Sequence, residues 1–294
     1  MSLRGAKPDD TLQELYRTAA QTRAEFSKDA ERAVAYYAEL VKFVSLAAPP
    51  SPGSDLLDVG CGSGWSSFSF ARAGYQTTGI DLNPQSFEPS HAQNLTFREG
   101  SALALPFENA TFDVVVTYQC LEHIPKPEAA LNEMVRVCRP AGTICIVGPN
   151  LVTPFLPMKF LVREFFTGSL VLRRDRTTPS HPYGNTAAEH LKSFIGISGL
   201  FMRKLLESRP SFTMRIPDLT PPFHADNDAC YLCNPIDLVR FFRTSGFRIL
   251  RRGKYGRSDA SSLFAGGTWI AAERIEALRA KVSTSFPFTG TTSI

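Results

Sequence analysis

The chain has 294 residues, of which 43% are hydrophobic and 20% are charged, enough for one large α/β domain with an insertion or for two domains. Its 32 basic and 28 acidic residues give a net charge of +4, which is too small to indicate a nucleic-acid partner by itself. No apolar run reaches the roughly 18 residues of a membrane span, and residues 1–8 lack the apolar core of a signal peptide. We therefore expect a soluble, cytoplasmic protein.

The N-terminal part is predicted to be helical. Within residues 9–47, Leu12, Leu15 and Tyr16 recur at helical spacing. Residues 49–54 contain three prolines, which cannot continue a helix. We place the start of the main domain there.

The stretch from Leu56 to Trp65 predicts a strand, a tight turn and the start of a helix. An apolar run ends near Asp58, and glycines follow at positions 60, 62 and 64. Glycine lets the main chain approach a ligand closely, and open α/β sheets bind nucleotides at such a turn. The dinucleotide fingerprint needs glycine at its sixth position, where this chain has Trp65. The spacing therefore disfavours NAD and FAD.

Further elements follow in the order of an α/β sheet. Residues 75–83 predict a strand ending in Asp81, 21 positions after Gly60, where nucleotide-binding folds place a carboxylate for the ribose hydroxyls. The segment 97–107 comes next. A further strand is predicted in the first part of residues 112–124. The next predicted elements are a helix over Pro127–Cys138, a turn at Arg139–Thr143 and a strand over Ile144–Val147.

These elements, in this order and spacing, resemble the class I S-adenosylmethionine-dependent methyltransferases of the type 11 or UbiE-like group. The resemblance is close over residues 54–150. It implies an α/β, Rossmann-like fold with a seven-stranded, mostly parallel sheet, an antiparallel last strand, helices on both faces and a helical cap insertion after the fifth strand. It also implies S-adenosyl-L-methionine as cofactor. The positions implied to bind it are Asp58, Gly60, Cys61, Gly62, Gly64, Asp81, Leu82, Ser101, Ala102 and Gln119.

One of these positions departs from the family pattern. Many relatives carry aspartate where this chain has Ser101, and that carboxylate accepts a hydrogen bond from the adenine amino group. A serine hydroxyl can also accept, so we expect the contact to persist in a weaker form.

The resemblance divides the chain into four parts. Residues 1–50 would be an N-terminal helical lid, 51–150 the cofactor-binding core, 151–228 a cap insertion that binds the acceptor, and 229–294 the C-terminal part of the core sheet. Tyr16, Tyr36 and Tyr37 are candidate lid residues, although packing against the sheet explains them equally well. At the C-terminal end, Asn234–Asp237 predicts a helix start, and strands are predicted over 247–250 and 267–272.

The cap is predicted to be functional because it is longer than the connection expected after the fifth strand. Its start is apolar and aromatic, and basic residues follow. A peripheral membrane contact through the cap is one interpretation of these basic residues, and a buried helix with a solvated charged edge is the favoured one. The residues concerned are Lys159, Arg163, Arg173, Arg174 and Arg176.

Catalysis on a hydroxyl acceptor would also require a base. Histidine titrates near neutral pH, and our candidates are His123, which follows the fourth strand, and His181 and His224, which lie in the predicted cap. A helix-start or packing role suits His123 about as well. His190, also in the predicted cap, is a further candidate, and Tyr183, Asp228 and Tyr231 stay open.

The six cysteines are expected to be buried thiols of a reducing compartment. Cys230 and Cys233 have a spacing that suits zinc, but no second pair follows, and we predict no metal site.

The predicted function is transfer of a methyl group to a small molecule, at an oxygen of a biosynthetic intermediate that is apolar, lipid-linked or a sugar. One alternative is a non-catalytic S-adenosylmethionine-binding interaction protein, which the departure at Ser101 allows. An RNA or protein methyltransferase ranks lower. Residues 118–121 lack the Asn/Asp-Pro-Pro-aromatic tetrad of enzymes that methylate exocyclic amines of nucleic-acid bases. The oligomeric state is left open.

Overall fold

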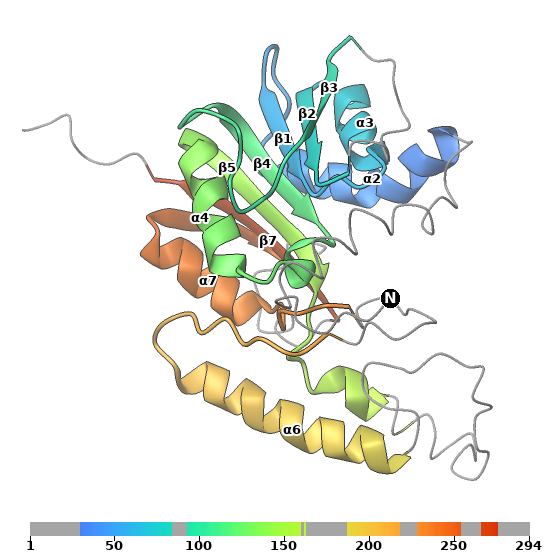
Figure 1. Cartoon of the computed structure of the whole chain (residues 1–294), viewed down its shortest axis with the longest axis vertical. Coiled ribbons are helices and arrows are strands. Elements are labelled where there is room, and N and C mark those ends of the chain that lie inside the picture. Colours follow the sequence, from blue (N-terminus) through green and yellow to red (C-terminus); the bar gives the residue numbers. More distant parts are fainter. Residues whose placement is uncertain are drawn as a thin grey trace, which may run out of the picture.

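The computed structural model describes residues 30–83, 93–159, 162, 187–217, 228–253 and 266–275. Within them, seven strands form one sheet in the order β3-β2-β1-β4-β5-β7-β6 (Figure 1). Strand β7 runs antiparallel to both β5 and β6, and the other neighbouring pairs are parallel. The predicted fold class is therefore confirmed. The strands are β1 Asp55–Val59, β2 Gln76–Asp81, β3 Leu95–Glu99, β4 Phe112–Tyr118, β5 Cys138–Pro149, β6 Phe247–Arg252 and β7 Gly267–Arg274.

Helices cover both faces of the sheet. The described ones are α2 Ala30–Ala47, α3 Trp65–Arg72, the 3-10 helix η4 Leu121–His123, α4 Pro127–Val137, α6 Ala187–Leu206 and α7 Pro235–Thr244. On one face, Phe43 of α2 and Phe70 of α3 are buried with Leu56 of β1. On the other, α4 and α7 bury a second cluster that includes Met134 and Phe242. The central strands therefore have apolar residues on both sides, as a doubly covered parallel sheet requires.

A turn was predicted over Arg139–Thr143, and this prediction is wrong, because the structure places these residues in a strand. These residues belong to β5, which begins at Cys138, directly after α4. Cys138 pairs with Phe112 and Thr143 with Val114, so the register shifts and the intervening residues bulge from the ladder. Ala141 in this bulge has a φ of 59°, the backbone conformation that suggested a turn.

The start of α7 was predicted correctly. The Asn234 side chain accepts a hydrogen bond from the backbone N–H of Asp237, and Pro235 occupies the first helical position.

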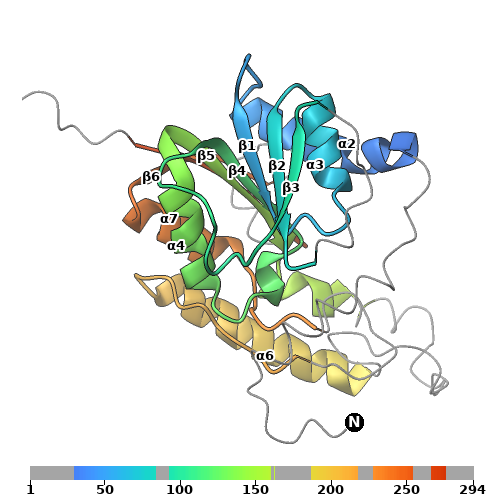
Figure 2. The ribbon, with the colours of Figure 1, turned by 45° about the horizontal axis from the view of Figure 1, so that its top comes forward.

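The segment predicted as a cap contains α6, a helix of 20 residues. It lies beyond the end of the sheet toward which the parallel strands point (Figures 1 and 2). Its buried Phe201 contacts a cluster that includes Val152, after β5, and Ile236 of α7. After α6 the chain returns to the core, where Met214 pairs with Tyr231. None of the helices in the described part of the chain has both the length and the apolar character needed to cross a bilayer.

Candidate active site

The glycine loop between β1 and α3 lies at the carboxyl ends of β1 and β2. The backbone N–H groups of Gly60 and Cys61 both donate to the carbonyl oxygen of Ile80, at 2.8 and 3.2 Å. Gly60 has a φ of +74°, and a Cβ at this position would lie 2.2 Å from the Cys120 Sγ. Position 60 therefore requires glycine for two reasons, backbone conformation and contact with the end of β4.

Gly62 differs from Gly60 in what surrounds it. Its N–H donates to the Asp81 Oδ2 at 2.8 Å, which brings the loop against the acid that ends β2. A Cβ at Gly62 would meet no heavy atom of the described residues within 4 Å. An open cradle thus lies beside the Asp81 carboxylate, where backbone can approach a ligand closely.

Asp58 is buried below the loop. Its Oδ2 accepts hydrogen bonds from the Ser66 and Ser67 hydroxyls of α3, at 2.6 and 2.7 Å. Its Oδ1 is buried and has no hydrogen-bond partner among the described residues. Burial, opposed by the two hydroxyls and reinforced by the charge of Asp81, raises the Asp58 pKa to about 6. A cationic group of a ligand placed at Oδ1 would satisfy this oxygen and favour the ionised carboxylate.

The residues at the end of β4 form the next wall of the site. Gln119 is exposed and has a φ of 50°, an uncommon backbone conformation for a non-glycine residue that often occurs at functional sites. Burial, followed by the negative charges of Asp81 and Glu122, raises the pKa of the neighbouring Cys120 thiol. Cys120 therefore lies between the glycine loop and the residues that follow β4.

Helix α2 brings two of the candidate lid residues to this end of the sheet. The Tyr37 ring lies 5.7 Å from the Tyr118 ring and 5.0 Å from that of Tyr36, measured between centroids. Burial and the charge of Asp58 raise the pKa of the Tyr37 hydroxyl, so this residue lies near the buried carboxylate. Tyr16 lies outside the described residues.

The remaining positions implied for the cofactor have a more peripheral setting. Leu82, Ser101 and Ala102 are half-buried. The Ser101 hydroxyl oxygen accepts from the backbone N–H of Leu103 at 3.2 Å, so it stabilises its own turn. Cys61 is buried, and Gly64 precedes the first residue of α3 with a φ of 89°. The roles of these residues toward the cofactor remain predictions.

His123 is the candidate base that the structure describes in detail. Its Nδ1 lies 3.4 Å from the Asp228 Oδ1, and its Nε2 lies 3.8 Å from the Oε1 of the fully buried Glu122. The backbone N–H groups of Cys230 and Tyr231 both donate to the Glu122 carbonyl oxygen at 2.9 Å. These bonds bring Asp228 to His123 although 105 positions separate them in the sequence.

Sequence reasoning left Asp228 open and assigned no role to Glu122. Glu122 is adjacent to His123 in the sequence, so it could have been considered as a neighbour of the candidate base. Nothing in the local sequence indicates that Asp228 lies beside His123. His181 and His224 lie outside the described residues.

Within the described ranges, the cysteines belong to no metal cluster. All six are thiols, five of them buried, as expected from the sequence. No group of three or more His, Cys, Asp or Glu side chains among the described residues is arranged to hold a metal ion.

Comparisons with known proteins agree with this geometry. Residues 57–146 match the family model described as methyltransferase domain. An uncharacterized protein of Mycobacterium tuberculosis is 34% identical over 148 residues, covering 48% of this chain and 53% of the relative. Norajmaline N-methyltransferase of Rauvolfia serpentina is 33% identical over 119 residues, covering 37% of this chain and 41% of the enzyme. The chain thus spans about half the length, or less, of these curated relatives.

The fold comparison extends further along the chain. A crystal structure from Listeria monocytogenes, provisionally assigned as an S-adenosylmethionine-dependent methyltransferase, superposes with a TM-score of 0.52 at 13% identity. The superposition covers 81% of this chain and 99% of the Listeria monocytogenes chain. Residues 57–146 therefore resemble a methyltransferase domain, and the order of the strands is that of the Rossmann-like fold of the class I S-adenosylmethionine-dependent enzymes.

S-adenosyl-L-methionine is the cofactor of that class, and the residues present fit it. The open cradle at Gly62 leaves room beside Asp81, whose carboxylate can accept hydrogen bonds from ribose hydroxyls. The Asp58 Oδ1 offers a buried negative atom to the cationic methionine end. When bound, this cofactor supplies an activated sulfonium methyl group.

Asp81→Ala is expected to weaken binding of S-adenosylhomocysteine by roughly 10- to 100-fold, because hydrogen bonds to a charged group are lost. Calorimetric titration measures this loss. Glu99→Ala is the matched control, since Glu99 ends the adjacent strand in register with Asp81 and is exposed. Equal affinities for Asp81→Ala and the unmodified protein would refute the ribose assignment.

Proposed function

We propose that the protein transfers the methyl group of S-adenosylmethionine to an oxygen of a small molecule, an apolar, lipid-linked or sugar biosynthetic intermediate. The observation that supports this most is the position of His123 between the Asp228 and Glu122 carboxylates, next to Cys120, which packs on the cofactor loop. Neutral imidazole can accept the hydroxyl proton, and the two carboxylates stabilise the imidazolium that forms.

The residues assigned to this reaction have separate tasks. The glycine loop and Asp81 hold the cofactor, and the cap that contains α6 covers the acceptor and keeps water out. His123 takes the proton that the acceptor hydroxyl loses, and the cofactor, when bound, would supply the methyl group that the oxygen gains. Asp228 is a positioning residue, since its Oδ1 lies 3.4 Å from Nδ1 and leaves Nε2, which lies 3.8 Å from the Glu122 Oε1, as the ring nitrogen that takes the proton.

The test is a turnover assay with radiolabelled S-adenosylmethionine and a panel of hydroxyl-bearing apolar, lipid-linked and sugar acceptors, with amines as a comparison set. His123→Gln is expected to lower turnover by roughly 10²- to 10⁴-fold, as loss of a general base does, with cofactor affinity retained. Asp228→Asn is expected to lower turnover less and to move the acidic limb of the pH–rate profile to lower pH, because the imidazolium loses a carboxylate neighbour.

The controls are the two rival bases. If His181→Gln or His224→Gln abolishes turnover and His123→Gln does not, the base is in the cap and the assignment is wrong. Methylation of amines alone, unaffected by His123→Gln, would favour a nitrogen acceptor, the atom named for the Rauvolfia serpentina relative. Cofactor binding without turnover on any acceptor would favour the non-catalytic alternative.

The pH dependence of cofactor binding tests Asp58. Its carboxyl becomes protonated as the pH falls below about 6, and the neutral form loses the attraction to a cationic ligand. We expect S-adenosylmethionine to bind about tenfold more weakly at pH 5 than at pH 8. In Asp58→Asn this dependence should disappear. An unmodified protein whose calorimetric affinity is the same at both values would show that Asp58 does not face the charged end of the cofactor.

A further inference from the structure

Helix α6 exposes an apolar surface on one side. We name this surface the α6 outer face and define it by its members, with their exposed fractions: Leu191 47%, Ile195 63%, Met202 55%, Leu205 42% and Leu206 84%. Leu191, Ile195, Met202 and Leu206 follow at intervals of four, seven and four positions, the spacing of one helical stripe. The stripe therefore points outward on one side of the helix, with Ser198 and Gly199 between its two halves.

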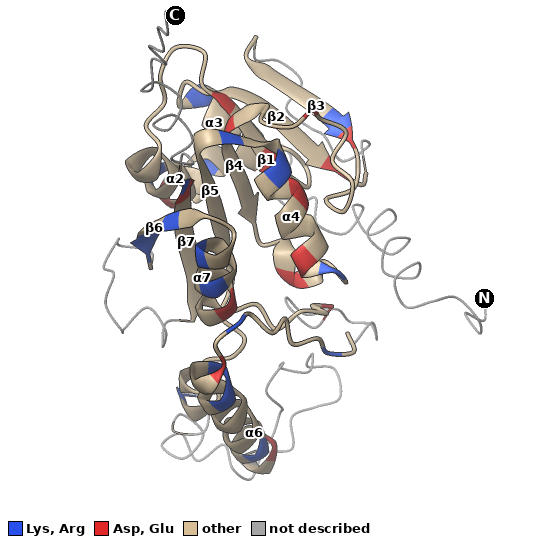
Figure 3. Cartoon of the chain, turned by 90° about the vertical axis from the view of Figure 1, so that its left-hand side faces the viewer, with Lys and Arg blue, Asp and Glu red and all other residues tan. Residues whose placement is uncertain are grey.

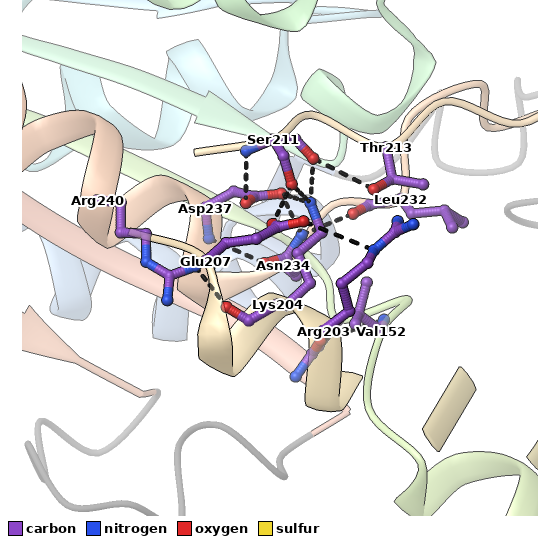
Figure 4. Close-up of polar contacts among 11 residues, drawn as sticks. Val152, Arg203, Lys204, Glu207, Ser211, Thr213, Leu232, Asn234, Asp237 and Arg240 are labelled. Atoms are coloured by element: carbon purple, nitrogen blue, oxygen red, sulfur yellow. Dashed lines mark hydrogen bonds and ion pairs between the residues drawn. The ribbon is translucent and has the colours of Figure 1, made fainter. Parts of the chain in front are cut away.

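The opposite side of α6 is fixed to the core. His190, Phe201 and Lys204 are buried. The Lys204 Nζ lies 2.6 Å from the Asp237 Oδ2 of α7 and also donates to the Ser211 hydroxyl at 2.8 Å (Figure 4). The helix cannot turn its outer face inward without breaking this buried ion pair, which is costly.

Exposed apolar side chains are concentrated in this part of the molecule. In the described part of the chain, nine of the twelve large hydrophobic residues that are exposed lie between positions 155 and 216. Besides the α6 outer face they include Phe155, Val162, Met214 and Ile216, the last of them 94% exposed. Large exposed apolar side chains that gather on one surface usually mark an interaction site.

Basic side chains border the stripe. Lys192 and Arg203 are exposed on α6, and Arg209 is exposed in the turn after it. Figure 3 shows both basic and acidic segments on α6. Of the two acids nearby, Glu189 is exposed in the first turn of α6. Glu207 lies 3.5 Å from Arg203 and accepts from the Ser211 hydroxyl, so part of its charge is compensated. An apolar stripe bordered by lysine and arginine is typical of a helix that lies in the plane of a membrane interface.

Charge also argues against a second copy of this chain as the occupant. In a two-fold pair formed through α6, each copy would bring three basic residues, Lys192, Arg203 and Arg209, and only two acids, Glu189 and Glu207, to the interface. An anionic lipid surface instead complements them. We therefore propose that the protein docks peripherally on anionic membranes through the α6 outer face, with α6 parallel to the surface. This goes beyond the proposed reaction and holds whichever acceptor is methylated.

Vesicle flotation with the full chain tests the docking. We expect it to float with phosphatidylcholine vesicles that contain about 30 mol% phosphatidylglycerol, and hardly at all with phosphatidylcholine alone. The double variant Ile195→Glu/Met202→Glu should bind at least about tenfold more weakly, because two apolar contacts are replaced by like charge. Leu46→Glu is the matched control, since Leu46 is 55% exposed on α2, away from the α6 outer face, and should change nothing.

The melting temperature and the cofactor affinity of each variant show whether it is folded, so misfolding can be told apart from lost docking. A variant that binds the cofactor but not the vesicles tests the docking alone, independently of the proposed reaction. Absence of flotation with the anionic vesicles, or equal flotation of the double variant, would overturn the proposal. Light scattering that shows a dimer which the double variant makes monomeric, with no vesicle binding by either, would assign the face to a second copy instead.

Discussion

Gly60→Ala is expected to destabilise the protein by roughly 2–5 kcal/mol and to abolish binding of S-adenosylmethionine. A Cβ at this position would lie 2.2 Å from the Cys120 Sγ and 2.7 Å from the Cys120 Cβ, and the φ of +74° disfavours any side chain. Relief of the clash must displace either the glycine loop or the end of β4, both of which line the proposed cofactor site. Urea unfolding and calorimetric titration measure the two effects.

Two variants make the test specific. Gly62→Ala has a similar backbone strain, with a φ of +56°, but its Cβ meets no atom of the described residues within 4 Å, so it should cost only about 1–2 kcal/mol of stability. It should still weaken cofactor binding, because its methyl group enters the open cradle. Gly60→Ala/Cys120→Gly should recover part of the stability lost in the single variant. A Gly60→Ala protein as stable as the unmodified chain would show that the loop does not pack on Cys120.

Lys204→Met is expected to cost about 3–5 kcal/mol of stability, because it leaves the Asp237 carboxylate buried and without its cation. Both side chains are fully buried, and the Asp237 carboxylate also accepts from the Ser211 N–H and the Asn234 amide (Figure 4). Removal of the ammonium therefore also loosens the attachment of α6 to α7. Urea unfolding measures the cost, and hydrogen exchange of α6 reports the loosening.

Arg203→Met provides the comparison. Arg203 is adjacent in sequence, but its side chain is 62% exposed and its ion pair with Glu207 spans 3.5 Å. Such surface pairs contribute at most about 1 kcal/mol. Equal stability losses in the two variants would contradict the buried position of Lys204.

The sheet was predictable because its signals are local. The central strands β1 and β4 are short, mostly apolar runs, and Asp58 and Asp81 mark the ends of β1 and β2 at family spacing. The helix start at Asn234 was equally local, since asparagine, proline and an acid follow within four positions. The segment Arg139–Thr143 was predicted as a turn, and the continuation of β5 through it was not predicted.

The parts of the site that sequence reasoning missed depend on contacts between distant positions. Lys204 and Asp237 each look like surface residues until the fold pairs them. Asp228 reaches His123 only because residues 230–231 bind the backbone of Glu122. Likewise, the spacing of the glycines gave no sign that Cys120 would pack on Gly60 and distinguish it from Gly62.

Calorimetric titration of the purified chain with S-adenosylmethionine, S-adenosylhomocysteine and NAD, side by side, tests the central claim most directly. The open cradle at Gly62, the carboxylate of Asp81 and the buried Oδ1 of Asp58 predict binding of the first two compounds and none of NAD. Binding of NAD, or of none of the three, would contradict the assignment of the Gly60 loop as an S-adenosylmethionine site.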